Sequence, residues 1–219
     1  IIAAETFDYD IIDKIYAPYD SLTMNVTLRA DGSTDKEIVA SLATGLKAGT
    51  AFEEDWAALR AAFRNKSLQM ASFTITEKGY TYTEADLARG LQPAFAMGKV
   101  CALLLERYHA GQLPLTVQSM DNCSHNGDKA KEGVFAYAEK WVADGLAPAA
   151  FLDYLKDESK ITFPWSMIDK ITPRPHEKVK EMLAADGFED NNYIETAKHT
   201  CSAPSENAAT LQYVLSAAN

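Results

Sequence analysis

The stretch Leu113–Asp128, LPLTVQSMDNCSHNGD, contains the change of pattern that decides the fold. Residues 113–120 are mainly apolar and predict a buried strand. Residues 121–128 are polar and prone to turn, and apolar residues return at helical spacing over 129–143. The stretch therefore predicts a strand, a polar loop and a helix, in that order.

The same alternation extends in both directions from this stretch. Buried strands are expected at 68–75 and 161–163, and the opening Ile1–Glu5 reads like the inside of a strand. Helical spacing predicts helices over 52–64, 93–109, 148–157 and 176–186. Residues 22–29 and 37–43, on either side of Asp31-Gly32, predict a β-hairpin.

Strands that alternate with helices predict an α/β domain with a mainly parallel sheet. Ligands of such sheets bind beyond the carboxyl ends of the strands. Three polar segments follow predicted strands and are expected to line one crevice: Thr76–Gly79, Asp121–Asn122 and Ser166–Lys170.

Composition excludes several classes of protein. The 219 residues are 47% hydrophobic and 24% charged, with a net charge of −10, which is typical of a globular chain. An acidic chain without a Lys/Arg cluster is not expected to bind nucleic acid or an anionic membrane. Three cysteines make no disulfide framework, so a cytoplasmic location is expected.

Several motifs of known chemistry are absent from the sequence. No two glycines are separated by one residue, so GxGxxG does not occur, and the P-loop, HExxH and GxSxG patterns are missing as well. Cys123-x-His125 and His199-x-Cys201 could pair as four zinc ligands, but their spacing is unusual for zinc and no metal site is expected. Each polar segment taken alone also fits an ordinary loop or helix start.

The three polar segments in series resemble one family, the long-chain polyol dehydrogenases of the mannitol dehydrogenase and fructuronate/tagaturonate reductase group. Thr74–Tyr80 matches a T-x-T-E-x-G-Y strand end, and Asp121–Gly127 matches a D-N-x-x-H-N-G loop. Phe163–Pro173 matches F-P-x-S-M-[IV]-D-[RK]-I-T-P. The resemblance covers about residues 1–200.

The resemblance implies an NAD-dependent, metal-independent oxidoreductase that interconverts a sugar alcohol or aldonate with its ketose or keto acid. Asn122 is implied to polarise the substrate oxygen, as an amide donor aimed at a developing alkoxide would. The expected site is completed by two further sets: His125, Asn126 and Asp169 toward the substrate, and Thr76 and Glu77 toward the cofactor. The choice among mannitol, arabinitol, fructuronate, tagaturonate and other polyols stays open, as does NAD against NADP.

The sequence also departs from the family. The opening glycine-rich turn is missing, and no lysine is followed by Asn five and His eight positions on, although that lysine is the family's proton acceptor. The chain is therefore expected to be part of a longer enzyme, without its first βα unit and its helical C-terminal domain. Residues 1–175 would form a partial Rossmann-like domain with an added β-hairpin, and 176–219 a helix and extension. Residues 201–219 look little like packed strands.

Two alternatives follow from these departures. The chain could be a non-catalytic domain of the same fold that binds a sugar acid or a nucleotide. A metal-dependent hydrolase or metal-storing domain built on the Cys/His pairs is the least favoured. If missing segments normally cover the sheet, the isolated chain is expected to self-associate through its uncovered apolar surface.

Overall fold

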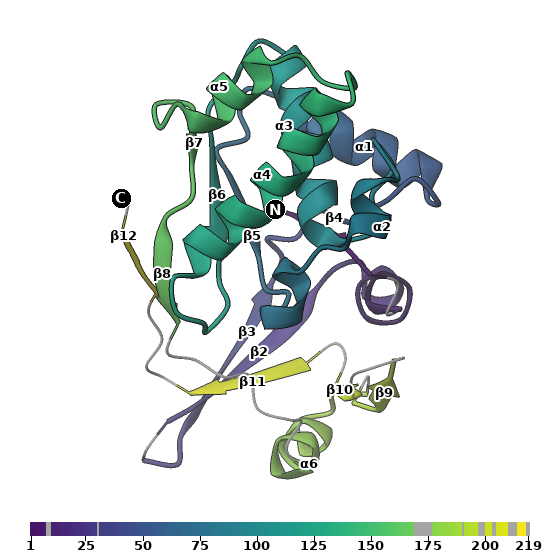
Figure 1. Ribbon diagram of the computed structural model, residues 1–219. Helices are drawn as coiled ribbons and strands as arrows, with labels where there is room; N and C mark the ends of the chain where they lie inside the picture. Colours follow the sequence, from purple (N-terminus) through teal and green to yellow (C-terminus); the bar gives the residue numbers. More distant parts are fainter. Residues whose placement is uncertain are drawn as a thin grey trace. The chain divides into compact units, whose positions relative to one another are not determined.

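The computed structural model describes residues 1–7, 10–29, 31–168, 177–189, 191–196, 200–202, 205–209 and 214–217, the last three ranges by backbone alone. The chain divides into two compact units (Figure 1). Unit 1 contains residues 1–47 and 170–213, and unit 2 contains residues 48–169 and 214–219. The division expected from the sequence, between residues 175 and 176, falls outside the described residues and stays a prediction.

Unit 1 is built from short strands and one longer helix. Its elements are β1 (Ile2–Glu5), a π-helical turn η1 (Ile12–Tyr16), a 3₁₀ turn η2 (Ala17–Tyr19), β2 (Thr23–Leu28), β3 (Thr34–Val39), β4 (Thr44–Lys47), α6 (Glu177–Ala185), β9 (Tyr193–Glu195), β10 (Thr200–Ser202) and β11 (Ser205–Ala209). β1 pairs with β4 in parallel, and β9 with β10 in antiparallel orientation. β2 lies between β3, its antiparallel hairpin partner, and the parallel strand β11.

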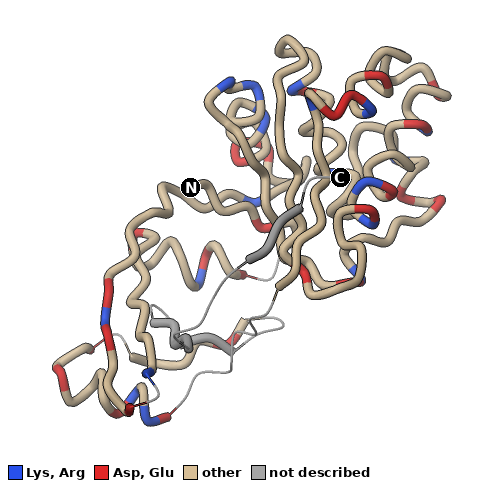
Figure 2. The backbone as a smooth tube through the Cα atoms, turned by 90° about the vertical axis from the view of Figure 1, so that its left-hand side faces the viewer, with Lys and Arg blue, Asp and Glu red and all other residues tan. Residues whose placement is uncertain are grey.

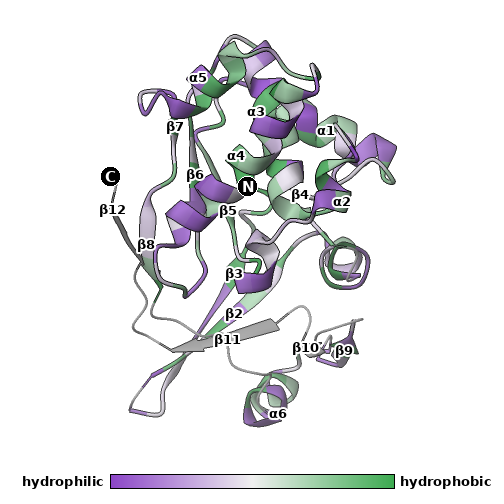
Figure 3. Cartoon of the chain, viewed as in Figure 1, coloured by the Kyte–Doolittle hydropathy of each residue, from purple (hydrophilic) through white to green (hydrophobic). Residues whose placement is uncertain are grey.

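The predicted hairpin and first strand are confirmed. Gly32 sits in the hairpin turn with φ +85°, a conformation that side chains disfavour. Val26 of β2 packs against Val179 and Leu183 of α6, a helix that mixes hydrophobic and hydrophilic residues (Figure 3). The Glu5 carboxylate, at the end of β1, accepts hydrogen bonds from the backbone N–H groups of Ile11 and Ile12 at 3.1 and 3.2 Å.

Unit 2 carries the alternation of strand and helix that the sequence predicts. Its elements are α1 (Glu53–Arg64), β5 (Met70–Phe73), a 3₁₀ turn η3 (Glu77–Tyr80), α2 (Glu84–Leu87), α3 (Ala96–His109), β6 (Leu115–Ser119), α4 (Asn126–Ala143), α5 (Ala150–Lys156), β7 (Ile161–Thr162), β8 (Trp165–Ile168) and β12 (Val214–Ala217). Strands β5, β6 and β7 form a parallel sheet in that order. The α/β class with a mainly parallel sheet is confirmed.

Three details differ from the sequence-based expectation. Residues 165–168, expected as a loop, form β8 and pair in antiparallel orientation with β12. β11 and β12 lie in the segment that looked unlike packed strands, because partners distant in sequence supply their hydrogen bonds. α4 begins at Asn126 rather than residue 129, so three residues of the polar loop belong to its first turn.

The core of unit 2 lies between the sheet and its helices. Val117 of β6 is fully buried, as are Met97 of α3, Tyr137 and Trp141 of α4 and Phe151 of α5. Burial of each such side chain contributes roughly 1.5–3 kcal/mol. The core makes a rigid base from which the ends of the strands project.

A buried arginine ties the loops at the opposite, amino ends of the strands. Arg107 of α3 is fully buried and donates to four backbone carbonyls, those of Phe63, Asn65, Leu68 and Pro114, at 2.6 to 3.2 Å. Burial lowers the pKa of this guanidinium, and the carbonyl dipoles supply the partners that a buried charge needs. Arg107 is therefore part of the framework.

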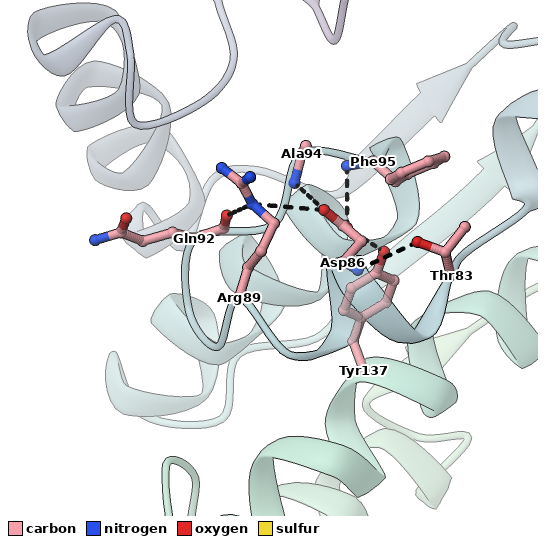
Figure 4. A network of polar contacts seen from close by, with 7 residues as sticks. All are labelled: Thr83, Asp86, Arg89, Gln92, Ala94, Phe95 and Tyr137. Carbon is pink, nitrogen blue, oxygen red and sulfur yellow. Dashed lines mark hydrogen bonds and ion pairs between the residues drawn. The ribbon is translucent and has the colours of Figure 1, made fainter.

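A buried carboxylate holds the corner between α2 and α3 (Figure 4). Asp86 is 3% exposed. It accepts from the backbone N–H groups of Ala94 and Phe95 at 2.9 and 3.3 Å, and from the Tyr137 hydroxyl at 2.5 Å. The hydroxyl of Thr83 accepts from the Asp86 N–H at 3.2 Å and caps α2. This corner fixes the start of α3 against α4.

Candidate functional site

The candidate site lies at the carboxyl ends of β5 and β6. Two loops leave the sheet there: residues 74–76 after β5, and residues 120–125 between β6 and α4. The end of a parallel sheet is where α/β folds bind ligands. Both loops belong to unit 2, so their mutual geometry is defined.

Asp121 joins the two loops. Its carboxylate accepts from the backbone N–H of Ile75 through both oxygens, at 3.1 and 3.0 Å, and from the N–H of Thr76 at 2.9 Å. The same carboxylate accepts from the Tyr80 hydroxyl at 2.5 Å. One side chain from the end of β6 thus satisfies the donors at the end of β5.

Among the groups that contact the Asp121 carboxylate, the hydroxyl of Tyr80 lies on the buried side. Tyr80 is 6% exposed and shares a hydrogen bond of 2.5 Å with the hydroxyl of the fully buried Ser119. Burial, followed by the hydrogen bond to Asp121, raises the pKa of Tyr80 well above its ordinary value. Tyr80 is therefore a neutral hydrogen-bond donor at physiological pH.

Asn126 fastens the β6–α4 loop to β8. Its side-chain amide is fully buried and donates to the Asp121 carbonyl and to the carbonyl and hydroxyl of Ser166, each at 2.9 Å. Its oxygen accepts from the Ser166 N–H at 3.0 Å. Ser166 in turn donates through its hydroxyl to the Ser119 carbonyl at 2.5 Å. The Asn126 side chain thus makes four hydrogen bonds within the described structure, to Asp121 and Ser166.

The next residue, Gly127, allows α4 to approach the segment between β7 and β8. A Cβ at this position would lie 2.3 Å from the carbonyl oxygen of Phe163 and 2.7 Å from that of Pro164. Both obstacles are backbone atoms, so they cannot turn aside. The glycine of the D-N-x-x-H-N-G pattern is required by this close approach.

His125 precedes α4 in the left-handed conformation, with φ +53°. Its exposed ring stacks on Trp165 of β8, with centroids 4.2 Å apart and planes 19° from parallel. Trp165 is 37% exposed, unlike the buried Trp56 and Trp141. The pair forms an aromatic surface beside the start of α4.

The cofactor-side residues lie at the beginning of η3. Thr76 has φ +60°, which costs a residue with a Cβ some backbone strain. The exposed Glu77 forms an ion pair with Lys129 of α4 at 2.5 Å. Lys129 lowers the pKa of Glu77 by this hydrogen bond and by its charge. The Glu77–Lys129 pair links η3 to the first turns of α4.

Asn122 is exposed and makes no side-chain hydrogen bond to the part of the chain that the structure describes. Its amide is therefore available to a ligand. Thr76, Glu77, His125 and Asn126 all come from the two loops or the elements directly after them, so the structure brings these predicted residues into one region. Their roles stay predictions, and Asp169 lies outside the described residues.

Asp121, Tyr80, Ser119 and Ser166 support the site but were not assigned as site residues from the sequence. Tyr80 and Asp121 belong to the quoted motifs. Asp121 is also adjacent to Asn122 in the sequence, and this was the available signal for its role. Ser166 belongs to the third motif and to a segment that was expected to line the crevice. Ser119 had no such signal, because its bond joins residues 47 positions apart.

No group of three or more His, Cys, Asp or Glu side chains is placed to hold a metal ion among the described residues. Cys123 is half-buried in the β6–α4 loop. His199 and the side chain of Cys201 fall outside the described structure, so a four-ligand pairing is not tested.

Comparison with known proteins identifies the family. Residues 4–200 match the mannitol dehydrogenase Rossmann domain, and the chain belongs to this family. A D-mannonate oxidoreductase of Thermotoga maritima is 45% identical over 96% of the chain.

Two crystal structures share the fold. One is of a D-sorbitol dehydrogenase in substrate-free form, with a TM-score of 0.74 and 24% identity over 98% of the chain, covering 43% of that structure. The other is Pseudomonas fluorescens mannitol 2-dehydrogenase in a ternary complex with NAD and D-mannitol, with a TM-score of 0.65 and 28% identity over 84% of the chain, covering 38% of that structure.

The chain is much shorter than these proteins. It spans 41% of the Thermotoga maritima relative. Charged residues of both signs are distributed over the described backbone (Figure 2). Among the described helices, none combines the length and apolar composition that a membrane span needs.

Proposed function

We propose that the protein carrying this chain is an NAD-dependent oxidoreductase that interconverts a sugar alcohol or aldonate with the corresponding ketose or keto acid. The observation that supports it is the joining of the T-x-T-E-x-G-Y and D-N-x-x-H-N-G segments by Asp121, in a chain of the mannitol dehydrogenase Rossmann family. The expected location is the cytoplasm.

Within this class we favour an aldonate as the substrate. The D-mannonate oxidoreductase is 45% identical to the chain, whereas the mannitol 2-dehydrogenase of known structure is 28% identical. An aldonate carries a carboxylate in addition to the hydroxyls of a polyol. A preference for D-mannonate over D-mannitol is the corresponding expectation.

The described residues fit part of a dinucleotide site. Thr76 and Glu77 follow the carboxyl end of β5, and their proposed place beside the cofactor is supported by the rule that parallel sheets bind ligands at this edge. The 219 residues contain no glycine-rich turn of the kind that holds a pyrophosphate. The proposal therefore assigns to this chain the side of the site that faces the substrate, together with Thr76 and Glu77 toward the cofactor, and NAD supplies the hydride acceptor when bound.

Asn122 is the residue proposed to contact the reacting oxygen. It directly follows Asp121, whose backbone and side chain are both held by hydrogen bonds, so the position of the exposed Asn122 amide is restricted. Donation from this amide to the substrate oxygen stabilises the charge that develops there as the proton leaves. The proton acceptor itself is not assigned to a residue of this chain.

The test is turnover of the complete protein that carries this sequence, with NAD and either D-mannonate or D-mannitol. We expect oxidation of D-mannonate to be the faster reaction. Asn122→Ala should lower kcat by about 10²–10³, the usual effect of removing one donor to a developing oxyanion. Asn65→Ala is the matched control, because this exposed Asn lies in the α1–β5 loop at the other end of the strands.

The alternative is a binding domain without turnover. The sequence observation in its favour is the absence of the lysine pattern that the family uses for proton transfer. Saturable binding of D-mannonate with no reduction of NAD by the complete protein would support this alternative. Unchanged kcat in Asn122→Ala would instead reject the role of that residue.

A further inference from the structure

The side chain and the main chain of Asp121 are held at the same time. Its carboxylate accepts from Ile75, Thr76 and Tyr80. Its N–H donates to the Ser119 hydroxyl at 3.3 Å, and its carbonyl accepts from the Asn126 amide at 2.9 Å. A residue anchored at this many points fixes the start of the chain segment that follows it.

The two backbone N–H groups that donate to the Asp121 carboxylate lie at a strained point of the backbone. Thr76 adopts φ +60° and ψ +166°, which a residue with a Cβ seldom takes. Such a conformation persists when surrounding bonds require it. The carboxylate supplies these bonds, because it accepts from the N–H groups of both Ile75 and Thr76, and bonds to an ionised acceptor are stronger than neutral ones.

The residues on either side of this contact are those of the proposed site. Asn122 follows Asp121 directly, and Glu77 follows Thr76. A shift of the Asp121 carboxylate would move both loops. Catalytic groups lose much of their effect when they are displaced by about 1 Å.

We infer that Asp121 is a positioning residue, which sets the place of the Asn122 amide and of the β5 end through its hydrogen bonds and does not itself touch the substrate. The inference rests on the proposed function, since Asn122 is the residue through which Asp121 acts. It also predicts a structural effect that is measurable without turnover.

The kinetic test is a double-mutant cycle of Asp121→Asn and Asn122→Ala in the complete protein. Asn keeps one acceptor oxygen but loses the charge, so Asp121→Asn alone should lower kcat by about tenfold. In the Asn122→Ala background the same change should cost less than about twofold, because its effect passes through the missing amide.

The control is Asp86→Asn. Asp86 accepts from two backbone N–H groups and one tyrosine hydroxyl, as Asp121 does, but lies at the α2–α3 corner. It should lower the thermal midpoint and leave kcat of the folded protein unchanged. Loss of kcat that follows loss of stability in both variants would overturn the inference.

The second readout is amide hydrogen exchange. In Asp121→Asn the Ile75 and Thr76 amides should exchange about tenfold faster than in the wild type, whereas Asp86→Asn should leave them unchanged. Unchanged exchange at both amides in Asp121→Asn would also overturn the inference.

The two proposals fail in different ways. If Asn122→Ala retains full kcat, the role of Asn122 in the proposed function is rejected, and the positioning role fails with it. If Asn122→Ala lowers kcat but Asp121→Asn costs tenfold in both backgrounds, only the positioning role is overturned.

Discussion

Asp86 and Asp121 accept hydrogen bonds from the same kinds of donor in two different regions of unit 2. Each carboxylate accepts from two successive backbone N–H groups and from one tyrosine hydroxyl. Asp86 is 3% exposed and lies in α2, where it accepts from the residues before α3, whereas Asp121 is half-buried at the end of β6. The same chemistry therefore fixes a helix packing in one region and a loop next to an exposed amide in the other.

The difference shows that an Asp–Tyr pair does not by itself indicate a functional site. What distinguishes Asp121 is the exposed residue that follows it and the position at the carboxyl end of a parallel strand. Around Asp86, the neighbouring groups serve only to hold α2, α3 and α4 together.

Replacing each carboxylate by Ala should give the largest effect. Asp86→Ala leaves two backbone N–H groups and the Tyr137 hydroxyl without their acceptor in the interior, so we expect a loss of roughly 3 kcal/mol or more in the free energy of unfolding. Asp121→Ala should cost less, because water can reach the half-buried loop. Urea unfolding measures both values, with the exposed Asp153→Ala as control. Equal losses would contradict the difference in burial.

Two glycines test how firmly each region is packed. A Cβ on Gly127 would meet backbone carbonyls, whereas one on Gly98, in the α3 corner, would meet the side chains of Pro93 and Tyr137 at 2.4 and 2.7 Å. We expect Gly127→Ala to destabilise by roughly 2–3 kcal/mol. Gly98→Ala should cost a similar amount, because the nearest atom is Cβ of the Pro93 ring and the Tyr137 ring is fully buried and bonded to Asp86. Thermal unfolding measures both, and stabilisation by Gly127→Ala, as in an ordinary helix, would contradict the close approach of α4 to the segment between β7 and β8.

The fall of the free energy of unfolding at alkaline pH allows Tyr80 and Tyr137 to be compared. Burial, with a hydrogen bond to the neighbouring carboxylate, raises the pKa of Tyr80 and Tyr137 above the value near 10 that they have when unfolded. The unfolded chain therefore loses these protons first. Stability is complete below about pH 10 and falls above it, by up to about 1.4 kcal/mol per pH unit for each tyrosine.

Replacement by Phe should make this fall shallower. We expect similar reductions from Tyr137→Phe and Tyr80→Phe, because both hydroxyls keep their protons in the folded protein over this pH range and share the same unfolded pKa. Tyr154→Phe is a third variant for calibration, since burial raises the pKa of Tyr154 to about 12 and its contribution ends there. Urea unfolding between about pH 9 and 11, the range around the unfolded tyrosine pKa, gives the slopes. Identical slopes in the wild type and Tyr137→Phe would contradict the pairing of Tyr137 with Asp86.

Much of unit 2 follows from local sequence pattern. α1 carries Trp56, Leu59 and Phe63 on its buried face, as the spacing predicts. The apolar run at 113–120 contains β6, and Thr83 caps α2. These features depend mainly on residues within the same short segment. The periodicity of apolar residues is therefore sufficient to predict them.

The strands that were missed depend on partners far away in the chain. β8 pairs with β12 and β11 pairs with β2, and neither β11 nor β12 shows a strong apolar pattern. Their hydrogen bonds are supplied by the partner strand, which no local window contains. Likewise, Ser119 and Ser166 read as ordinary polar residues until the fold places them together.

By itself the sequence determined the α/β class, the family resemblance and the two loops that carry the candidate site, because these depend on local periodicity and on motifs of a few residues. Tertiary structure alone decided that Asp121 closes over the end of β5, that Asn126 is enclosed by Ser166 and that Asn122 stays exposed. These outcomes depend on which donors and acceptors meet across 40 or more positions of the chain, as the pairs of Asn126 with Ser166 and of Thr76 with Asp121 do. Folding of the parallel sheet brings those groups together.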